Sequence, residues 1–275
     1  MGNDPAMGND PIAPPRLAAT VLLLRDGEDG MEVFMVVRHH EIDFASGALV
    51  FPGGRVDPGD HDIAADPALY PNADGHDGTA LRVAAIRETF EECGVLLARP
   101  RGSGALVDAL RLRAIEAAHG AALLAGTTSF AAMLNAEDLV LAPDQLVAFA
   151  HWITPVRISK RFDTHFFLAV APADQIAIHD GSESVDSTWI SPRAAIAETE
   201  AGRYKLVFPT EMNLKKLGRH ANTDAAIAAA RAGKVVTVLP EPVKAEENGV
   251  RYLRLPLEAG YGGEVFEVKN PPSIR

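Results

Sequence analysis

The chain has 275 residues and a formal net charge of −11, with 47% hydrophobic and 23% charged residues. This composition is typical of a folded globular protein and excludes a wholly disordered chain. The acidic balance argues against general nucleic-acid binding, which requires a basic face. Cys93 is the only cysteine, so an intramolecular disulfide and a cysteine-rich zinc site are excluded. We expect a cytoplasmic protein, because no apolar run is long enough to span a membrane and no signal peptide is recognisable.

The middle of the chain contains no Gly/Ser-rich or Pro-rich linker, so we expect one elaborated domain over residues 16–275. Residues 1–15 repeat the pentapeptide Met-Gly-Asn-Asp-Pro and are expected to form a disordered tail. Three additions to the domain are expected. They are an insertion at 58–78, a helical insertion at 98–144 and a C-terminal extension at 221–275.

The first elements are predicted to be strands. Residues 17–24 and 32–37 are apolar and β-branched, and the turn-forming cluster 25–30 separates them, which predicts a hairpin. Residues 48–51 predict a strand that enters a tight turn at the adjoining Pro-Gly-Gly. Residues 57–78 are rich in Asp, Pro, Gly and Asn, and predict an irregular surface segment.

The following elements alternate between helices and strands. Residues 79–93 predict a strong helix, and Gly94 is placed to end it. Helical patterns recur at 105–124, 130–135, 194–199, 210–220 and 223–232, and strand patterns at 145–153, 164–171, 187–190, 235–239, 250–255 and 264–268.

The helix predicted over 79–93 has two different faces. Its apolar stripe, which can pack on a sheet, consists of Val83, Ile86, Phe90 and Cys93. Glu88, Glu91 and Glu92 gather on the opposite side, close enough to share a cation. In an arbitrary helix such a face is usually only solvated, because like charges at this spacing cost only about 0.2–0.5 kcal/mol per pair. The triplet alone therefore does not define a site.

The residues around this glutamate triplet form a longer motif. The segment 54–60 is followed by Arg87-Glu88-Thr89-Phe90-Glu91-Glu92-Cys93-Gly94-Val95, and together they resemble the box of the Nudix hydrolase family. Three features depart from the family pattern. Asp60 replaces its first glutamate, 26 residues rather than seven separate Asp60 from Arg87, and Thr89 replaces an aliphatic residue. The resemblance implies an α/β class fold, a Nudix-type α/β/α sandwich with a mixed β-sheet.

The same resemblance implies site roles. Glu88, Glu91, Glu92 and the carbonyl of Gly54 would bind Mg²⁺ or Mn²⁺, while Arg87 would orient the carboxylates of the box. Hard oxygen ligands suit these cations, and substrate phosphates can complete their coordination shell. The implied reaction is hydrolysis of a diphosphate linkage in a small-molecule nucleotide.

Two carboxylates are candidates for the general base. Glu88 is one of them. Glu183 is the other, since it lies in a polar loop shortly before Trp189, where several family members place an additional catalytic glutamate. An exposed loop glutamate without a catalytic role is an equal alternative for Glu183.

The segment before the box bears on the substrate. Arg38 precedes Gly47 by nine residues, and Gly47 precedes Phe51 by four, a spacing similar to that of the coenzyme A branch of the family. The segments 46–54 and 152–167 resemble the long-box acyl-coenzyme A diphosphatase group. This resemblance covers roughly residues 17–220 and implies cleavage to a phosphopantetheine product and adenosine 3′,5′-bisphosphate.

Local positive charge could bind such a ligand on an acidic protein, although surface arginines are commonly only solvated. The candidate substrate-binding residues are Arg38, His39, Arg157 and Arg161, with Lys160 beside them. Two alternatives stay open: a hydrolase of ADP-ribose, NADH or another dinucleotide, and a catalytically impaired Nudix-like ligand sensor. The resemblance also implies a homodimer.

Overall fold

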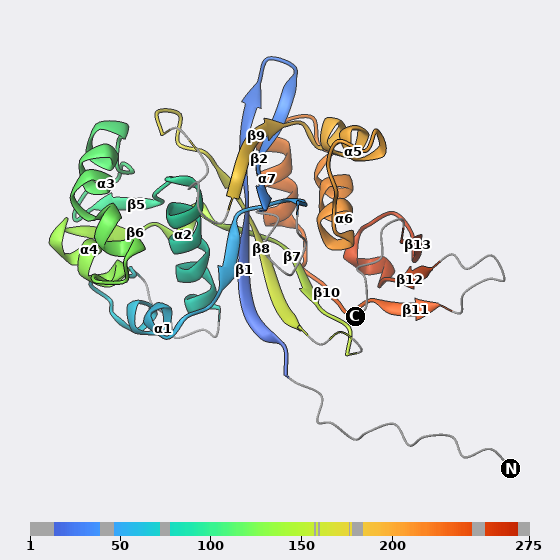
Figure 1. Cartoon of the computed structure of the whole chain (residues 1–275), viewed down its shortest axis with the longest axis horizontal. Helices are drawn as coiled ribbons and strands as arrows, with labels where there is room; N and C mark the ends of the chain where they lie inside the picture. Colours follow the sequence, from blue (N-terminus) through green and yellow to red (C-terminus); the bar gives the residue numbers. More distant parts are fainter. Residues whose placement is uncertain are drawn as a thin grey trace, which may run out of the picture.

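A mixed β-sheet forms the centre of the computed structural model (Figure 1). Its strands run in the order β10-β7-β8-β1-β2-β3, with β4 also pairing to β1 and β9 to β2. The structure describes residues 14–38, 47–71, 78–156, 158, 160–175, 177, 184–243 and 251–268.

The predicted hairpin is present. β1 (Arg16–Gly27) and β2 (Gly30–Arg38) pair antiparallel, and Gly27 lies opposite Gly30 across the turn. Successive residues of β1 are buried on opposite faces of the sheet: Val21 belongs to one apolar core, and Leu22 to the other. A strand buried on both faces is typical of the middle of a sheet with helices on each side.

The remaining strands make the sheet mixed. β8 pairs parallel with β1 and antiparallel with β7, and β10 pairs parallel with β7. The bounds are β3 Leu49–Val50, β4 Gly53–Arg55, β7 Val147–Ile153, β8 Phe162–Val170, β9 Ser184–Ile190 and β10 Thr237–Val238.

Helices cover both faces of the sheet, as Figure 1 shows. α2 (Thr79–Cys93) and α1 (Pro58–Ala65) lie on one side. The other side carries α5 (Pro192–Glu200), α6 (Phe208–Leu217) and α7 (Thr223–Ala232). Each helical layer has its own apolar core against the sheet. The predicted α/β/α sandwich is therefore confirmed.

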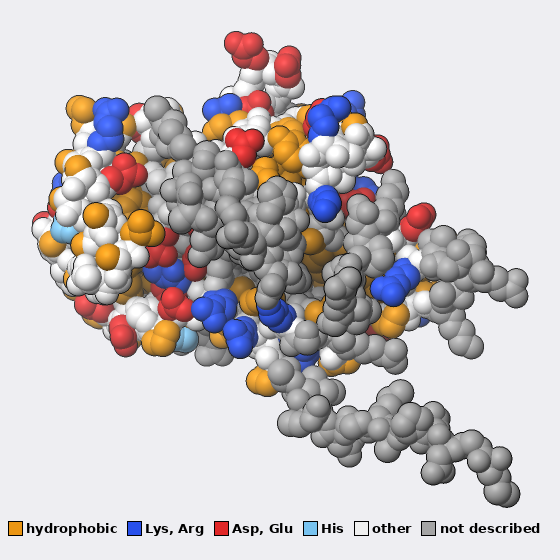
Figure 2. All heavy atoms as spheres, in the orientation of Figure 1, with side chains coloured by type: hydrophobic (Ala, Val, Ile, Leu, Met, Phe, Trp, Pro, Cys, Tyr) orange, Lys and Arg blue, Asp and Glu red, His pale blue; other side chains and the backbone are white. Residues whose placement is uncertain are grey.

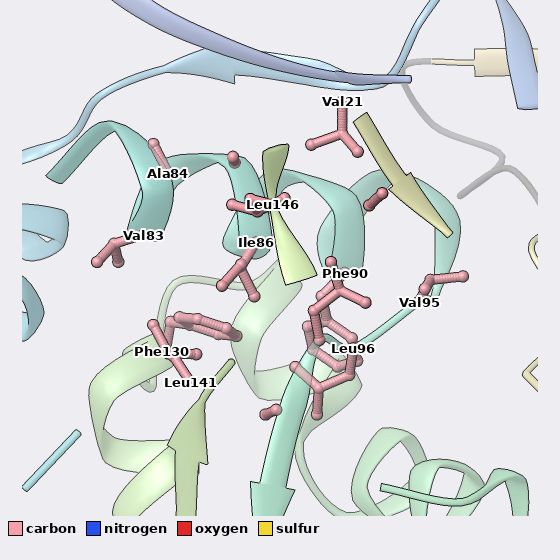
Figure 3. Close-up of a cluster of buried hydrophobic side chains, with 14 of the residues drawn as sticks. Val21, Val83, Ala84, Ile86, Phe90, Val95, Leu96, Phe130, Leu141 and Leu146 are labelled. Atoms are coloured by element: carbon pink, nitrogen blue, oxygen red, sulfur yellow. The ribbon is translucent and has the colours of Figure 1, made fainter. Parts of the chain in front are cut away.

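The helix predicted over 79–93 has those bounds in the structure. Figure 3 shows Val83, Ile86 and Phe90 directed into an apolar cluster, and all three are buried. The helix ends at Gly94, whose φ of 65° is left-handed and whose N–H donates to the carbonyl of Phe90 at 2.9 Å. Glycine adopts this conformation without the steric cost that a Cβ would bring. The apolar stripe thus fixes which side of α2 is left for polar residues.

The expectation of an irregular segment over 57–78 is wrong for its first part. Residues 58–65 form α1, in which Pro58 occupies the first turn and Ile63 is buried. The backbone N–H of Asp57 donates to the Asp60 carboxylate at 2.8 Å, which stabilises the start of the helix. The helix-start signal was present in the sequence, but the abundance of Asp, Pro and Gly obscured it. Residues 72–77 lie outside the described part.

A helical module follows α2. α3 (Ala109–Leu124) and α4 (Phe130–Ala136) lie between β5 (Ala98–Pro100) and β6 (Leu139–Leu141), which pair antiparallel. α3 begins at residue 109 and not at 105, because the Asp108 side chain caps it by accepting from the Arg111 N–H at 2.8 Å.

The C-terminal segment forms a small sheet, β11-β12-β13, of which β11 was not predicted. The strands are β11 Glu241–Val243, β12 Tyr252–Arg254 and β13 Val265–Glu267. Buried Tyr261 ties this segment to the main sheet, since its hydroxyl accepts from Trp152 Nε1 and donates to Asn213 Oδ1, both at 2.8 Å. Within the described ranges, no helix combines the length and the apolarity needed to cross a membrane.

We propose that the extension 221–275 unfolds cooperatively with the rest of the domain, and the Tyr261 hydroxyl allows a test. Tyr261→Phe leaves Trp152 and Asn213 without these buried hydrogen bonds, which costs about 1–3 kcal/mol. Urea denaturation of the whole chain, followed by tryptophan fluorescence, should show that loss. Tyr252→Phe on half-buried β12 is the control, with a change within about 0.5 kcal/mol. Equal stability of the two variants would contradict the role given to Tyr261.

Candidate functional site

The polar face of α2 lies against the glycine turn that contains β4. Gly53 and Gly54 pair with Thr20 and Ala19 of β1. A Cβ on Gly54 would lie 2.3 Å from Oε1 of Glu88, and one on Gly53 would lie 2.3 Å from the carbonyl oxygen of Ala19. Only glycine permits this close approach of the turn to both neighbours.

Glu92 binds the same turn directly. Its Oε2 accepts a hydrogen bond from the backbone N–H of Gly53 at 2.8 Å. The turn therefore contacts Glu88 and Glu92 on α2 through two adjacent glycines. This arrangement places backbone groups of residues 53–54 among the carboxylates.

Arg87 is the centre of the site. Its guanidinium makes a two-pronged contact with Asp60, Nε to Oδ1 at 2.8 Å and Nη2 to Oδ2 at 2.9 Å. Nη1 donates at 2.9 Å to both Glu88 and Glu91, and Nη2 also donates to the carbonyl of Arg55 at 3.0 Å. One nearly buried arginine thus connects α1, β4 and two carboxylates of α2.

Asp60 pairs with Arg87 although 26 residues separate them in the sequence. Asp60 is 1% exposed, and α1 packs against α2, so the shorter carboxylate still makes two hydrogen bonds with one edge of the guanidinium. Burial of a carboxylate is tolerated here because it is paired and hydrogen-bonded. The structure brings together every box residue that the sequence singled out.

Electrostatics distinguish the carboxylates. Burial raises the pKa of Glu88 to about 7, although Arg87 lowers it, and the charges of Glu91 and Asp60 add to the increase. Burial also raises the pKa of Glu91, again against Arg87. For Arg87, burial acts to lower the pKa, but the hydrogen bond to Asp60 and the surrounding negative charges outweigh it and hold the pKa above its usual value.

The gathered oxygen donors suit a cation. Asp60, Glu88 and Glu91 pair with Arg87, and Glu92 lies beside them against the Gly53 N–H, so four carboxylates gather at the glycine turn. Gathered carboxylate oxygens beside a backbone carbonyl are the donors that Mg²⁺ and Mn²⁺ prefer, so the residues fit such an ion.

Thr89 departs from the aliphatic residue of the family pattern without disturbing the helix. It is fully buried, and its Oγ1 donates to the carbonyl of Ala85 at 2.7 Å. The hydroxyl is satisfied within α2, so the departure leaves no unpaired polar group.

Most of the candidate substrate-binding residues lie outside the described part of the chain. His39 and Arg157 are not described, nor is the side chain of Arg38, although the backbone of Arg38 pairs with Ser184 at the start of β9. The base candidate Glu183 also lies outside the described residues. Arg161 is described, and its Nε donates to the carbonyl of Thr154 at 3.1 Å. Figure 2 shows Lys and Arg side chains gathered on the same face as α1, toward the start of β1.

Three polar residues of the sheet were not singled out from the sequence. His151, Asp163 and His165 lie together on β7 and β8. Asp163 and His165 are two residues apart on β8, so the sequence alone places them on one face of a strand. His151 joins them only because the register of β7 and β8 pairs it with His165.

Comparison with known proteins agrees with the geometry. The family model described as the NUDT19 Nudix domain matches residues 72–217, which is 146 of the 275 residues. The crystal structure of a NUDIX hydrolase from Alicyclobacillus acidocaldarius is 31% identical, with a TM-score of 0.66, and the match covers 79% of this chain and 97% of that one.

Two curated relatives extend the comparison. A Caenorhabditis elegans protein named nudix hydrolase 7 is 27% identical over 231 residues, covering 83% of this chain and 68% of the relative. The human acyl-coenzyme A diphosphatase NUDT19 is 27% identical over 234 residues, covering 70% of this chain and 62% of the relative. The chain thus spans less than two thirds of the human protein. With the box residues assembled on α2 and a family model matching more than half its length, the chain belongs to the Nudix hydrolases, as an enzyme of the Nudix diphosphatase class.

Proposed function

We propose that the chain hydrolyses a diphosphate linkage with Mg²⁺ or Mn²⁺ held by Glu88, Glu91, Glu92 and the carbonyl of Gly54. The observation that carries this proposal is the cluster around Arg87, whose guanidinium pairs with Asp60 of α1 and with Glu88 and Glu91 of α2. A solvated glutamate face would lack such a buried organising arginine and the contact with the glycine turn.

Each residue has a separate role in this proposal. A bound divalent cation would neutralise negative charge on the phosphoryl oxygens and would lower the pKa of a water bound to it. Arg87 holds Glu88 and Glu91 in place, and Asp60 fixes Arg87 from the opposite side. Glu88 is a base candidate, since its largely buried carboxylate lies at the glycine turn among the other box carboxylates. Glu183 stays the second candidate.

For the substrate, we propose coenzyme A or acyl-coenzyme A, cleaved to a phosphopantetheine product and adenosine 3′,5′-bisphosphate. The match to the NUDT19 Nudix domain and the name of the human relative support this class. The glycine turn beside α2 belongs to the segment that carries the coenzyme A resemblance. We further propose that the protein acts in the cytoplasm as a homodimer.

Glu91→Gln tests the metal assignment. The variant keeps the shape of the side chain but removes one charge, so kcat/KM with Mn²⁺ should fall by about two to three orders of magnitude, as when a group that stabilises transition-state charge is lost. Glu116→Gln on α3 is the matched control, because it removes a helical glutamate whose pKa burial also raises. Full activity in Glu91→Gln would refute the assignment.

Asp60→Asn tests the interrupted box. The amide cannot pair with Arg87 as a carboxylate does, so the free energy of unfolding in EDTA should fall by about 1–3 kcal/mol, and activity should fall with it. Asp62→Asn, on the exposed side of α1, should leave both quantities nearly unchanged. If the two variants behave alike, Asp60 does not serve the site.

A substrate panel tests the proposed specificity. Coenzyme A, a short acyl-coenzyme A, ADP-ribose and NADH are compared at equal concentration with Mn²⁺, and products are identified by mass spectrometry. We expect the highest kcat/KM for the coenzyme A compounds, with adenosine 3′,5′-bisphosphate as a product. Turnover of ADP-ribose with coenzyme A untouched would overturn the specificity, and tight binding without any hydrolysis would favour a ligand sensor.

A further inference from the structure

A second cluster of side chains of metal-ligating types lies on the main sheet and shares no residue with the α2 carboxylates. His151 of β7 lies directly opposite His165 of β8, and Asp163 lies two residues along from His165. One ligand atom from each of the three lies within 4.8 Å of the other two. All three side chains are half-buried, so an ion could reach them from solvent.

The distances show how closely the ligand atoms converge. Oδ1 of Asp163 is 2.5 Å from Nε2 of His151 and 3.6 Å from Nε2 of His165. The two imidazole rings are stacked, with centroids 4.0 Å apart. Both Nε2 atoms are therefore near the same carboxylate oxygen.

The orientation of His151 is set from outside the cluster. Its Nδ1 lies 2.8 Å from Oγ1 of Thr237, which is the residue paired with His151 on the neighbouring strand β10. This hydrogen bond at Nδ1 orients the ring so that Nε2 is directed toward Asp163, as the outer hydrogen bonds of metal-binding histidines do.

His165 is suited to act as a neutral ligand. Burial lowers its pKa to about 4, with the neighbouring His151 adding to the decrease and Asp163 opposing it. An imidazole that is neutral at pH 7 offers its lone pair without first losing a proton.

We propose that His151, Asp163 and His165 bind a transition-metal ion of the Zn²⁺ class, at a site distinct from the α2 carboxylates. Two imidazoles and one carboxylate form a donor set that Zn²⁺ accepts with a coordination position left open. Imidazole nitrogen favours Zn²⁺ over Mg²⁺, which prefers oxygen. The alternative, a polar network without a metal, is an outcome of the test below.

The strand register places this site beside the Nudix residues. His165 pairs with Ala19, and Ala19 pairs with Gly54, the glycine that contacts Glu88. Paired residues share one face of a sheet, and adjacent strands are about 4.8 Å apart, so His165 and Gly54 are separated by about 10 Å along the sheet. Phe167, two residues after His165, packs in the apolar core that contains α2, so the cluster is on the α2 side.

The test uses Co²⁺ as a spectroscopic substitute for Zn²⁺ in a protein whose Nudix carboxylates are disabled by Glu88→Gln and Glu91→Gln. We expect one equivalent of Co²⁺ to bind with visible absorption bands that indicate nitrogen ligands, and Zn²⁺ to displace it. His165→Gln and His151→Gln, added separately, should each weaken binding at least 10-fold. His119→Gln is the matched control. His119 also contacts a carboxylate, because its Nε2 lies 2.9 Å from Oε1 of Glu137.

Absence of Co²⁺ and Zn²⁺ binding in the Glu88→Gln/Glu91→Gln protein would overturn the proposal, and this result does not depend on whether the histidine variants fold. Equal affinity in the His165 and His119 variants would also overturn it.

The second readout is the ¹⁵N chemical shift of the histidine rings in the chain without substitutions. Addition of Zn²⁺ should move the Nε2 signals of His151 and His165 and leave those of His119 in place. Because Glu88 and Glu91 are replaced in the first experiment, it measures the histidine cluster and not the Nudix site, so its failure leaves the proposed diphosphatase function unaffected.

Discussion

The buried guanidinium of Arg87 is the interaction on which the rest of the site depends. It binds Asp60 with two nitrogens and reaches Glu88 and Glu91 with the third, so it sets the positions of helices α1 and α2 relative to each other. Removal of one partner from a buried ion pair is costly because the other charge is left uncompensated. The same residue therefore serves both the packing of the domain and the arrangement of its carboxylates.

The apolar and polar faces of α2 depend on each other. The stripe that includes Val83 and Phe90 fixes the rotation of the helix against the sheet, and this rotation brings Glu88 and Glu92 to the glycine turn. Because Gly53 and Gly54 have no side chains, the turn approaches close enough to contact both carboxylates. Core packing and site geometry are thus two consequences of one helix orientation.

Much of this could be predicted from local sequence. The bounds of α2 followed from its apolar period and from Gly94, and the β1–β2 hairpin followed from two β-branched runs around a turn cluster. α1 was missed because a short helix rich in Asp and Gly has little apolar period, even though Asp57, Pro58 and Asp60 mark its start. Local signals succeed where one element decides the outcome.

Contacts between distant segments could not be predicted in the same way. The pairing of Asp60 with Arg87 spans 26 intervening residues and requires α1 to pack on α2. His151, Asp163 and His165 come together only through the register of β7 and β8, which short-range patterns do not specify. In both cases tertiary packing, and not spacing along the chain, creates the cluster.

The central claim is that the carboxylates gathered by Arg87 hold the catalytic cation. The most direct measurement is a crystal structure of the protein with Mn²⁺, with the ion located by its anomalous scattering. We predict an anomalous peak in contact with oxygens of Glu88, Glu91 and Glu92 beside the turn at Gly54. A fully formed site without such a peak, or Mn²⁺ bound only elsewhere, would contradict the account.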